Sequence, residues 1–144
     1  MIQFREMEVK DIQEVSKIEE ETFSMPWSSD AFLEMIEADY AHYIVAEEDD
    51  KIIGSCGLRN IVGEGEITNV VMRPEYRNKG IGLNMLCKLM KDGEQMGVEA
   101  FTLEVRESNA PAIHVYEKIG FRAEGMRKNF YEKPCEDAVI MWKR

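Results

Sequence analysis

A loop with two glycines, "EYRNKGIG" at residues 75–82, carries residue types that could hold a phosphate. Gly80 and Gly82 stand between an apolar run and a helical pattern, so they mark the start of a predicted helix. Backbone N–H groups and the positive end of the helix dipole converge there, and glycines leave them open to an anion. Arg77 and Lys79 add positive charge to an otherwise acidic chain. On this local pattern, phosphate binding and an unliganded strand–helix turn both stay open.

Two familiar phosphate loops are excluded by the same residues. The stretch lacks G-x-x-x-x-G-K-[ST], so it is not the Walker loop of a nucleotide-binding protein. It also lacks G-x-G-x-x-G, because Gly82 is followed by Leu83, Asn84 and Met85. A nucleotide-phosphate function is therefore disfavoured.

A second stretch, "TLEVRESNAPAIHVYEKIGF" at residues 102–121, holds groups that could move a proton. Glu104 interrupts an apolar strand pattern, and Asn109 and Tyr116 share one face of the helix that follows. Each has a simpler explanation alone: an ion-paired strand acid, a helix cap and a core tyrosine. Together, beside a phosphate-type loop, they fit an acid–base site.

Apolar periodicity and turn residues predict the elements that position these stretches, in the order β-α-α-β-β-β-α-β-α-β-β. Ser28 or Ser29 and Asn109 are expected N-caps, and Gly97 and Gly120 expected C-caps. A helix over 80–96 separates two strand patterns, which allows a parallel pair. We expect one α+β domain over residues 1–144.

Composition narrows the possible partners and compartment. With 18 basic and 28 acidic side chains, the formal net charge is −10, which disfavours direct nucleic-acid binding and suits a basic partner, or only aids solubility. No apolar run approaches the ~18 residues of a membrane span, and the N-terminus lacks a signal core, so we expect a cytoplasmic protein without membrane contact. Cys56, Cys87 and Cys135 lie far apart, which predicts a reduced protein without a metal site, with Cys87 in the core.

The two stretches together resemble the GCN5-related N-acetyltransferases (GNAT). Residues 77–82, "RNKGIG", fill the acetyl-CoA signature R/Q-x-x-G-x-G/A, with the strand "VVM" before it and a helix after it. "LEVRESNAPAIHVYEKIGF" resembles the second half of the family site. The resemblance spans nearly the whole chain and implies the GNAT fold, a mixed central sheet of about seven strands flanked by about four helices.

Within the family the chain is most similar to the RimI type, which acetylates the N-terminal alanine of a small-subunit ribosomal protein. The motifs are "MPWS" at 25–28, the stretch 103–121, and "R-NFY" with a late "EDA-IM" at 127–141. The similarity implies an N-terminal protein acetyltransferase with acetyl-CoA as cosubstrate, no metal, and a basic N-terminal peptide as acceptor. A GNAT enzyme acting on a small-molecule amine or lysine, and a non-catalytic acyl-CoA-binding module, are the alternatives.

The resemblance also assigns residues to the coenzyme. A strand of three residues matches the one that holds the pantetheine arm, with the Val71 N–H on the thioester carbonyl. Asn109 matches an amide that contacts the coenzyme. Leu83 departs from many relatives, which carry a basic residue there, so Arg77 and Lys79 are left to supply charge. The expected coenzyme residues are Val70, Val71, Met72, Arg77, Asn78, Lys79, Gly80, Ile81, Gly82, Leu83 and Asn109.

For catalysis, the resemblance makes Glu104 the general base and Tyr116 the general acid. We expect the pKa of Glu104 to be raised by burial among its apolar strand neighbours Phe101, Leu103 and Val105. We also expect an acidic groove that attracts the acceptor peptide. Trp27 is expected either to line this groove or to anchor the helices beside it. The candidate groove acids are Glu34, Glu37, Asp39, Glu132 and Glu136.

Overall fold

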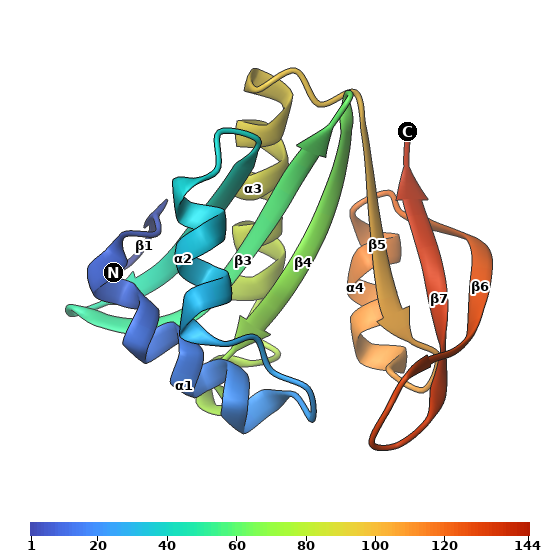
Figure 1. Ribbon diagram of the computed structural model, residues 1–144, viewed down its shortest axis with the longest axis horizontal. Coiled ribbons are helices and arrows are strands. Elements are labelled where there is room, and N and C mark those ends of the chain that lie inside the picture. The colour runs from blue at the N-terminus through green and yellow to red at the C-terminus, as the bar shows by residue number, and fades with distance from the viewer.

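The computed structural model describes residues 1–144 and contains one mixed seven-stranded sheet in the order β1-β2-β3-β4-β5-β7-β6 (Figure 1). Four α-helices pack on the two faces of this sheet. In chain order the elements are β1 Ile2–Glu6, α1 Ile12–Thr22, α2 Ser29–Glu37, β2 Ala41–Glu48, β3 Lys51–Ile61, β4 Glu64–Met72, α3 Ile81–Gln95, β5 Ala100–Arg106, α4 Ala110–Lys118, β6 Arg122–Tyr131 and β7 Glu136–Lys143. Short 3₁₀ turns at Val9–Asp11 and Pro74–Tyr76 precede α1 and α3.

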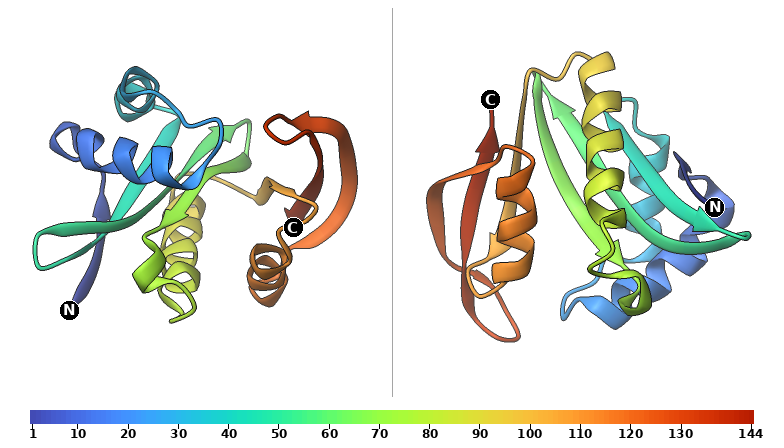
Figure 2. Two further views of the ribbon diagram at one scale, coloured as in Figure 1. Left: turned by 90° about the horizontal axis from the view of Figure 1, so that it is seen from below. Right: turned by 180° about the vertical axis from the view of Figure 1, so that it is seen from behind.

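Helices α1 and α2 lie on one face of the sheet, and α3 and α4 lie on the other (Figures 1 and 2). Each face has its own apolar cluster, because side chains of a strand alternate between faces. On β2, Ile44 joins the cluster under α3, whereas Val45 joins the cluster under α1 and α2. A residue's place in a strand therefore decides which of the two helical layers it meets.

The predicted element order and the mixed α+β class are confirmed, and the fold is the GNAT fold. The caps are confirmed as well. Ser28 Oγ accepts a hydrogen bond from the Ala31 N–H at 3.2 Å, and Asn109 Oδ1 accepts one from the Ala112 N–H at 3.3 Å. Gly97 ends α3 with a φ of 93° in the left-handed region, where a glycine costs least.

The prediction for Cys87 was wrong. The buried stripe of α3 falls on Met85, Leu86, Leu89 and Met90, which leaves Cys87 on the exposed side of the helix. Cys56 on β3 is the buried cysteine. No helix in the fold has the length and apolar character needed to cross a membrane.

Strands β4 and β5 pair in parallel for a short distance only. Their register joins Glu64–Glu66 to Ala100–Thr102, although β4 continues to Met72 and β5 to Arg106. Beyond the paired residues the two strands diverge, as Figure 1 shows. A bulge lies in β4, where the register with β3 shifts and Asn69 has a φ of 57°. The divergence therefore opens the middle of the sheet at the carboxyl ends of both strands.

Candidate active site

The diverging end of β4 has backbone groups that no strand pairs. The Arg73 N–H donates to Ile53 O at 2.8 Å, so these two residues form a hydrogen-bonded antiparallel pair. By alternation, Val71 turns its N–H toward β3, and Met72 turns its N–H away from β3. Buried or half-buried N–H groups need an acceptor, which an extended polar ligand lying along β4 can supply.

This direction disagrees with the expectation for Val71. An N–H that points at β3 cannot reach a carbonyl lying between β4 and β5. We therefore move the expected contact from Val71 to a neighbouring amide of β4 on the open side, where Met72 stands. The strand was predictable from its residues, but the direction of each N–H was not, because the bulge at Asn69 shifts the pairing with β3.

The glycine loop leads from β4 into α3. Asn78 and Gly80 have φ values of 62° and 78°, so Gly80 serves a left-handed position. Gly82 is different, because it lies inside the first turn of α3. A Cβ placed on it would approach only Met72 Cε, at 3.9 Å. Neither backbone conformation nor packing requires glycine there, which agrees with a ligand that approaches closely.

The first turn of α3 supplies free donors to such a ligand. The Asn84 N–H makes the first bond of the helix, to Gly80 O, so the N–H groups of Ile81, Gly82 and Leu83 have no acceptor in the chain. With the helix dipole, they form a site suited to a phosphate.

The two basic side chains of the loop make few contacts within the chain. Arg77 donates from Nε to Met72 O at 3.0 Å, which ties the loop to the end of β4. Lys79 Nζ lies 5.9 Å from the ring centre of Tyr76. Neither side chain forms an ion pair within the chain, so both are available beside the helix N-terminus to a polyphosphate ligand.

Glu104 lies on β5, on the face of the sheet that α1 and α2 cover. Its neighbours Leu103 and Val105 belong to the opposite cluster, under α3 and α4. Burial raises the pKa of Glu104 above its ordinary value, the Arg127 guanidinium opposes this, and the Glu66 carboxylate adds to it. The direction of the shift agrees with the expectation for a general base.

The surroundings that cause this shift differ from those expected. Phe101, Leu103 and Val105 point away from Glu104, because residues next to each other in a strand face opposite sides. Arg127 Nε on β6 lies 3.0 Å from Glu104 Oε2 but is not aligned for a hydrogen bond, so that oxygen is buried without a hydrogen-bond donor. Within the chain the Glu104 carboxylate is thus held by this ion pair and accepts no hydrogen bond.

Tyr116 approaches from the other side of the sheet. It lies on α4, in the cluster under α3 and α4, with its ring 6.0 Å from that of Phe121. Burial raises the pKa of its phenol, so the group keeps its proton at neutral pH. The hydroxyl makes no hydrogen bond within the chain. A protonated donor without an internal acceptor is available to a leaving group.

The fold thus brings the predicted groups to the same opening from different directions. Glu104 belongs to the α1–α2 face and Tyr116 to the α3–α4 face, and the loop 78–83 follows the end of β4. Asn109 caps α4 with its Oδ1 and keeps its amide nitrogen free. Glu104 and the first turn of α3 therefore belong to separate parts of the fold.

Sequence reasoning missed residues on β5 and β6 that lie near Glu104. Tyr131 is near enough for Glu104 to affect it: burial first, and then that carboxylate, raise the pKa of Tyr131 to about 12. Arg127 and Arg106 also contact this region. The "R-NFY" motif contained Arg127 and Tyr131, but the pattern of one strand cannot show that β6 lies one strand away from β5, across β7.

The residues expected to form the acceptor groove differ in their contacts and exposure. Trp27 packs against Phe32 and Tyr43, with ring centres 5.4 and 5.9 Å away, so it anchors the α1–α2 loop. Glu136 is held by Arg106 and by the Ser108 N–H, and these bonds lower its pKa. The remaining acids, Glu34, Glu37, Asp39 and Glu132, are exposed.

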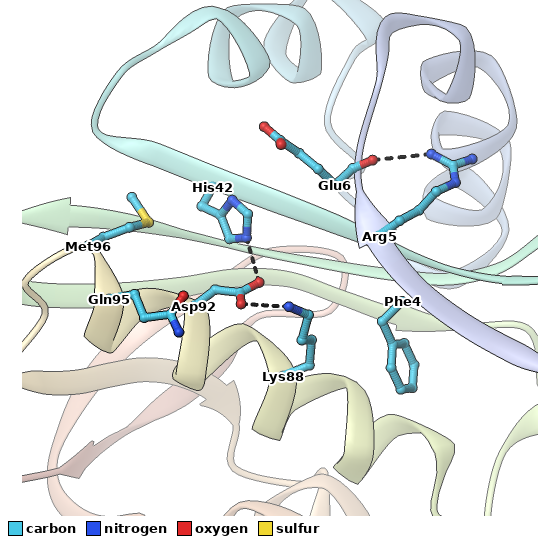
Figure 3. A pocket seen from close by; sticks show the side chains of 8 residues that line it. All are labelled: Phe4, Arg5, Glu6, His42, Lys88, Asp92, Gln95 and Met96. Carbon is cyan, nitrogen blue, oxygen red and sulfur yellow. Dashed lines mark hydrogen bonds and ion pairs between the residues drawn. The ribbon is translucent and has the colours of Figure 1, made fainter.

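A separate pocket lies between β1, β2 and α3, away from β5 (Figure 3). Its Asp92 carboxylate is already bonded to His42 at 2.9 Å and to Lys88 at 2.7 Å. Burial alone would raise the pKa of Asp92, but these two bonds outweigh it and lower the pKa. The Asp92 carboxylate is thus already paired, and the lining of the pocket is Phe4, Arg5, Glu6, His42, Lys88, Asp92, Gln95 and Met96. No group of side chains in the structure is arranged to hold a metal ion.

Comparison with known proteins shows the family of this chain. The model of the acetyltransferase (GNAT) family matches residues 12–121, which contain the loop, Glu104 and Tyr116. The chain belongs to the GNAT family of acetyltransferases. It is therefore an acetyl-CoA-dependent N-acetyltransferase, and the helix N-terminus and open strand described above fit the pyrophosphate and the amide-containing arm of that cosubstrate.

Its relatives are similar over nearly their full length. A Bacillus subtilis (strain 168) protein, provisionally named [ribosomal protein bS18]-alanine N-acetyltransferase, is 39% identical over 96% of this chain and 92% of its own. The Haemophilus influenzae [ribosomal protein bS18]-alanine N-acetyltransferase is 34% identical over 94% of each chain. The crystal structure of the ribosomal-protein-S18-alanine N-acetyltransferase from Escherichia coli superposes with a TM-score of 0.91, at 29% identity, over 99% of this chain and 93% of the other.

The geometry of Gly82 leads to a prediction that separates ligand binding from folding. Gly82→Ala should leave the free energy of unfolding unchanged or raise it by up to about 1 kcal/mol, because its Cβ meets open space and alanine favours a helix. The same change should weaken acetyl-CoA binding, measured by calorimetry. Gly80→Ala is the contrast, since its left-handed φ should make that variant less stable. Unchanged acetyl-CoA affinity in Gly82→Ala would contradict the assignment of the loop.

Proposed function

We propose that this enzyme acetylates the N-terminal α-amine of a ribosomal protein, with an N-terminal alanine as the acceptor residue. The observation that carries the proposal is the placement of Glu104, a half-buried carboxylate that accepts no hydrogen bond within the chain, on the face opposite Tyr116 where β4 and β5 diverge. The names of relatives that are 34% and 31% identical along nearly the whole chain support the choice of acceptor.

An α-amine suits the modest base that Glu104 provides. Only a neutral amine attacks a thioester, and an α-amino group has a pKa of about 7.7–8.0 against about 10.4 for lysine. Deprotonating lysine at neutral pH costs about 3.4 kcal/mol more, from a gap of about 2.5 pKa units. In the proposal, the Glu104 carboxylate takes the amine proton, directly or through a water.

The other half of the reaction belongs to β4 and α4. Acetyl-CoA supplies an activated acetyl group as a thioester. An N–H on the open side of β4 stabilises the oxyanion that develops on the thioester carbonyl. Tyr116 holds its proton because burial raises its pKa, and it donates that proton to the leaving sulfur. No covalent enzyme intermediate is required, and Cys87 lies on the outer side of α3.

Charge supports a basic acceptor peptide. The enzyme has a net charge of −10, and exposed acids stand on α2 and next to it at Glu34, Glu37 and Asp39, and on the β6–β7 hairpin at Glu132. Acids beside an opening raise the association rate of a basic chain at low salt. Glu136 contributes less to this field, because Arg106 neutralises it.

The role of Glu104 predicts a pH profile. Glu104→Gln should lower kcat by about 10²-fold or more, while leaving the Kd of acetyl-CoA within about twofold. In the wild type, kcat should rise with pH through the raised pKa of Glu104, because a base acts when deprotonated. Arg127→Gln removes a cation that lowers this pKa, so the acid limb should move to higher pH.

Arg122→Gln, also on β6 but without an ion pair to Glu104, is the control and should keep the wild-type acid limb. If the limb stays in place in Arg127→Gln, or if Glu104→Gln turns over normally, Glu104 is not the base.

For Tyr116, the matched change is Tyr116→Phe, which removes only the hydroxyl. Because that hydroxyl has no partner in the chain, the melting temperature should not fall. Turnover should drop by about 10²-fold with little change in acetyl-CoA affinity, since a general acid acts only in the reaction step. Steady-state kinetics and calorimetry measure the two quantities. Full activity in this variant would remove Tyr116 from the mechanism.

The acceptor is tested with a peptide panel read by mass spectrometry. Basic peptides that begin with a free alanine should be acetylated once, at the N-terminus. The same peptides with a blocked N-terminus should stay unmodified even when they contain lysine. Equal transfer to lysine or to small amines would contradict the proposed acceptor, and acetyl-CoA binding without any transfer would indicate a non-catalytic module.

A further inference from the structure

Arg106, the last residue of β5, joins segments that are far apart in the chain. Its Nη1 donates to Pro134 O at 3.0 Å and to Glu136 Oε1 at 3.1 Å. Its Nη2 donates to Glu132 O at 3.0 Å and to Ser24 Oγ at 3.3 Å. One half-buried guanidinium therefore holds two main-chain carbonyls, a carboxylate and a hydroxyl.

These partners belong to two segments on either side of the acceptor face. Ser24 lies in the loop between α1 and α2, and residues 132–135 form the turn of the β6–β7 hairpin. Figure 2 shows this loop reaching toward the hairpin on the side where β4 and β5 diverge. Ser24 also donates directly to Glu132 O, at 3.3 Å. We call Arg106, Ser24 and the hairpin turn 132–135 the acceptor clamp.

The clamp lies next to the proposed base. Arg106 and Glu104 are two residues apart on β5, so their side chains share one face of the sheet. The Arg106 guanidinium lies over the ring of Tyr131, 4.5 Å from its centre, and Tyr131 is the hairpin residue that Glu104 influences. Movement of the hairpin would therefore displace a side chain beside Glu104.

We propose that Arg106 is a positioning residue for the acceptor: it holds the α1–α2 loop and the β6–β7 hairpin at a fixed separation in front of Glu104. The proposal rests on the proposed function, because it assumes that an amine reaches Glu104 from this face. Arg106 touches neither reacting group, so its loss should change how the acceptor binds more than the rate of the chemical step.

The geometry explains why an arginine is needed. A guanidinium directs planar N–H groups to several acceptors at once, and four of its contacts are used here. A lysine has one nitrogen and cannot span both the loop and the hairpin. Methionine keeps the apolar stem but leaves the carbonyls of Glu132 and Pro134 without this donor. We therefore expect a graded effect, with Arg106→Lys intermediate.

The experiment measures KM and kcat for an N-terminal alanine peptide, together with the Kd of acetyl-CoA. Arg106→Met should raise the peptide KM about tenfold or more, as expected for lost charge-assisted hydrogen bonds, with kcat within about threefold. The Kd of acetyl-CoA should stay within about twofold, because the loop 78–83 is untouched. Arg106→Lys should recover part of the loss in KM.

Ser24→Ala gives a second test that does not threaten folding, since Ser24 is exposed. It should raise the peptide KM by about two- to fivefold. In a double-mutant cycle with Arg106→Met, the two effects should be less than additive, because both remove the same bond.

Arg5→Met is the matched control, since Arg5 is another half-buried guanidinium with several acceptors, the carboxylates of Glu8, Asp11 and Glu47, but it lies far from β5. It should lower thermal stability without changing the peptide KM. An unchanged peptide KM in Arg106→Met, or an equal rise in Arg5→Met, would overturn the clamp. Absence of transfer by the wild type would instead contradict the proposed function.

Discussion

The short parallel pairing of β4 with β5 is the constraint on which the rest of the site depends. The strands share a register at Glu64–Glu66 and Ala100–Thr102 and then separate. A sheet that stayed paired would satisfy every backbone group of β4 internally and leave no room for a ligand. Because the pairing stops, amides near Met72 need another acceptor, and the amide-containing arm of acetyl-CoA can provide it.

The same divergence explains how one opening serves two substrates. Glu104 and Tyr116 lie on opposite faces of the sheet, which would keep them apart in a continuous sheet. Where the strands separate, groups from both faces can reach the same thioester. The helix α3 begins at the end of β4, so its free N–H groups lie where the phosphates of the cosubstrate would follow from its arm.

Sequence alone predicted the order of elements, because caps and periodicity are local. Ser28, Asn109 and Gly97 act within one or two turns of their own helices, so their roles were visible without the fold. The divergence of β4 from β5 was not visible, since it depends on pairing between distant strands. Cys87 was misplaced because the apolar pattern of α3 does not show where the buried stripe of the helix ends. A boundary drawn one residue too far puts an exposed position such as Cys87 into the core.

For the residues of the proposed site too, local features could be predicted from the sequence, whereas contacts between strands could not. The sequence indicated Glu104 and Tyr116 and the direction of the Glu104 pKa shift. It could not indicate that Arg127 approaches from β6, nor that Arg106 joins the loop at Ser24 to the β6–β7 hairpin, because both contacts cross between strands. The direction of the Val71 N–H was also hidden, since the bulge in β4 sets it.

The most direct test of this account is a titration of ¹⁵N-labelled protein with coenzyme A, followed by amide chemical shifts. The account predicts that the largest changes fall on Met72 and on Ile81, Gly82 and Leu83, where free N–H groups face the opening between β4 and β5. Amides around His42 and Asp92, in the pocket beside β1, should stay in place. Large changes at that pocket, with the amides of α3 and β4 unmoved, would contradict it.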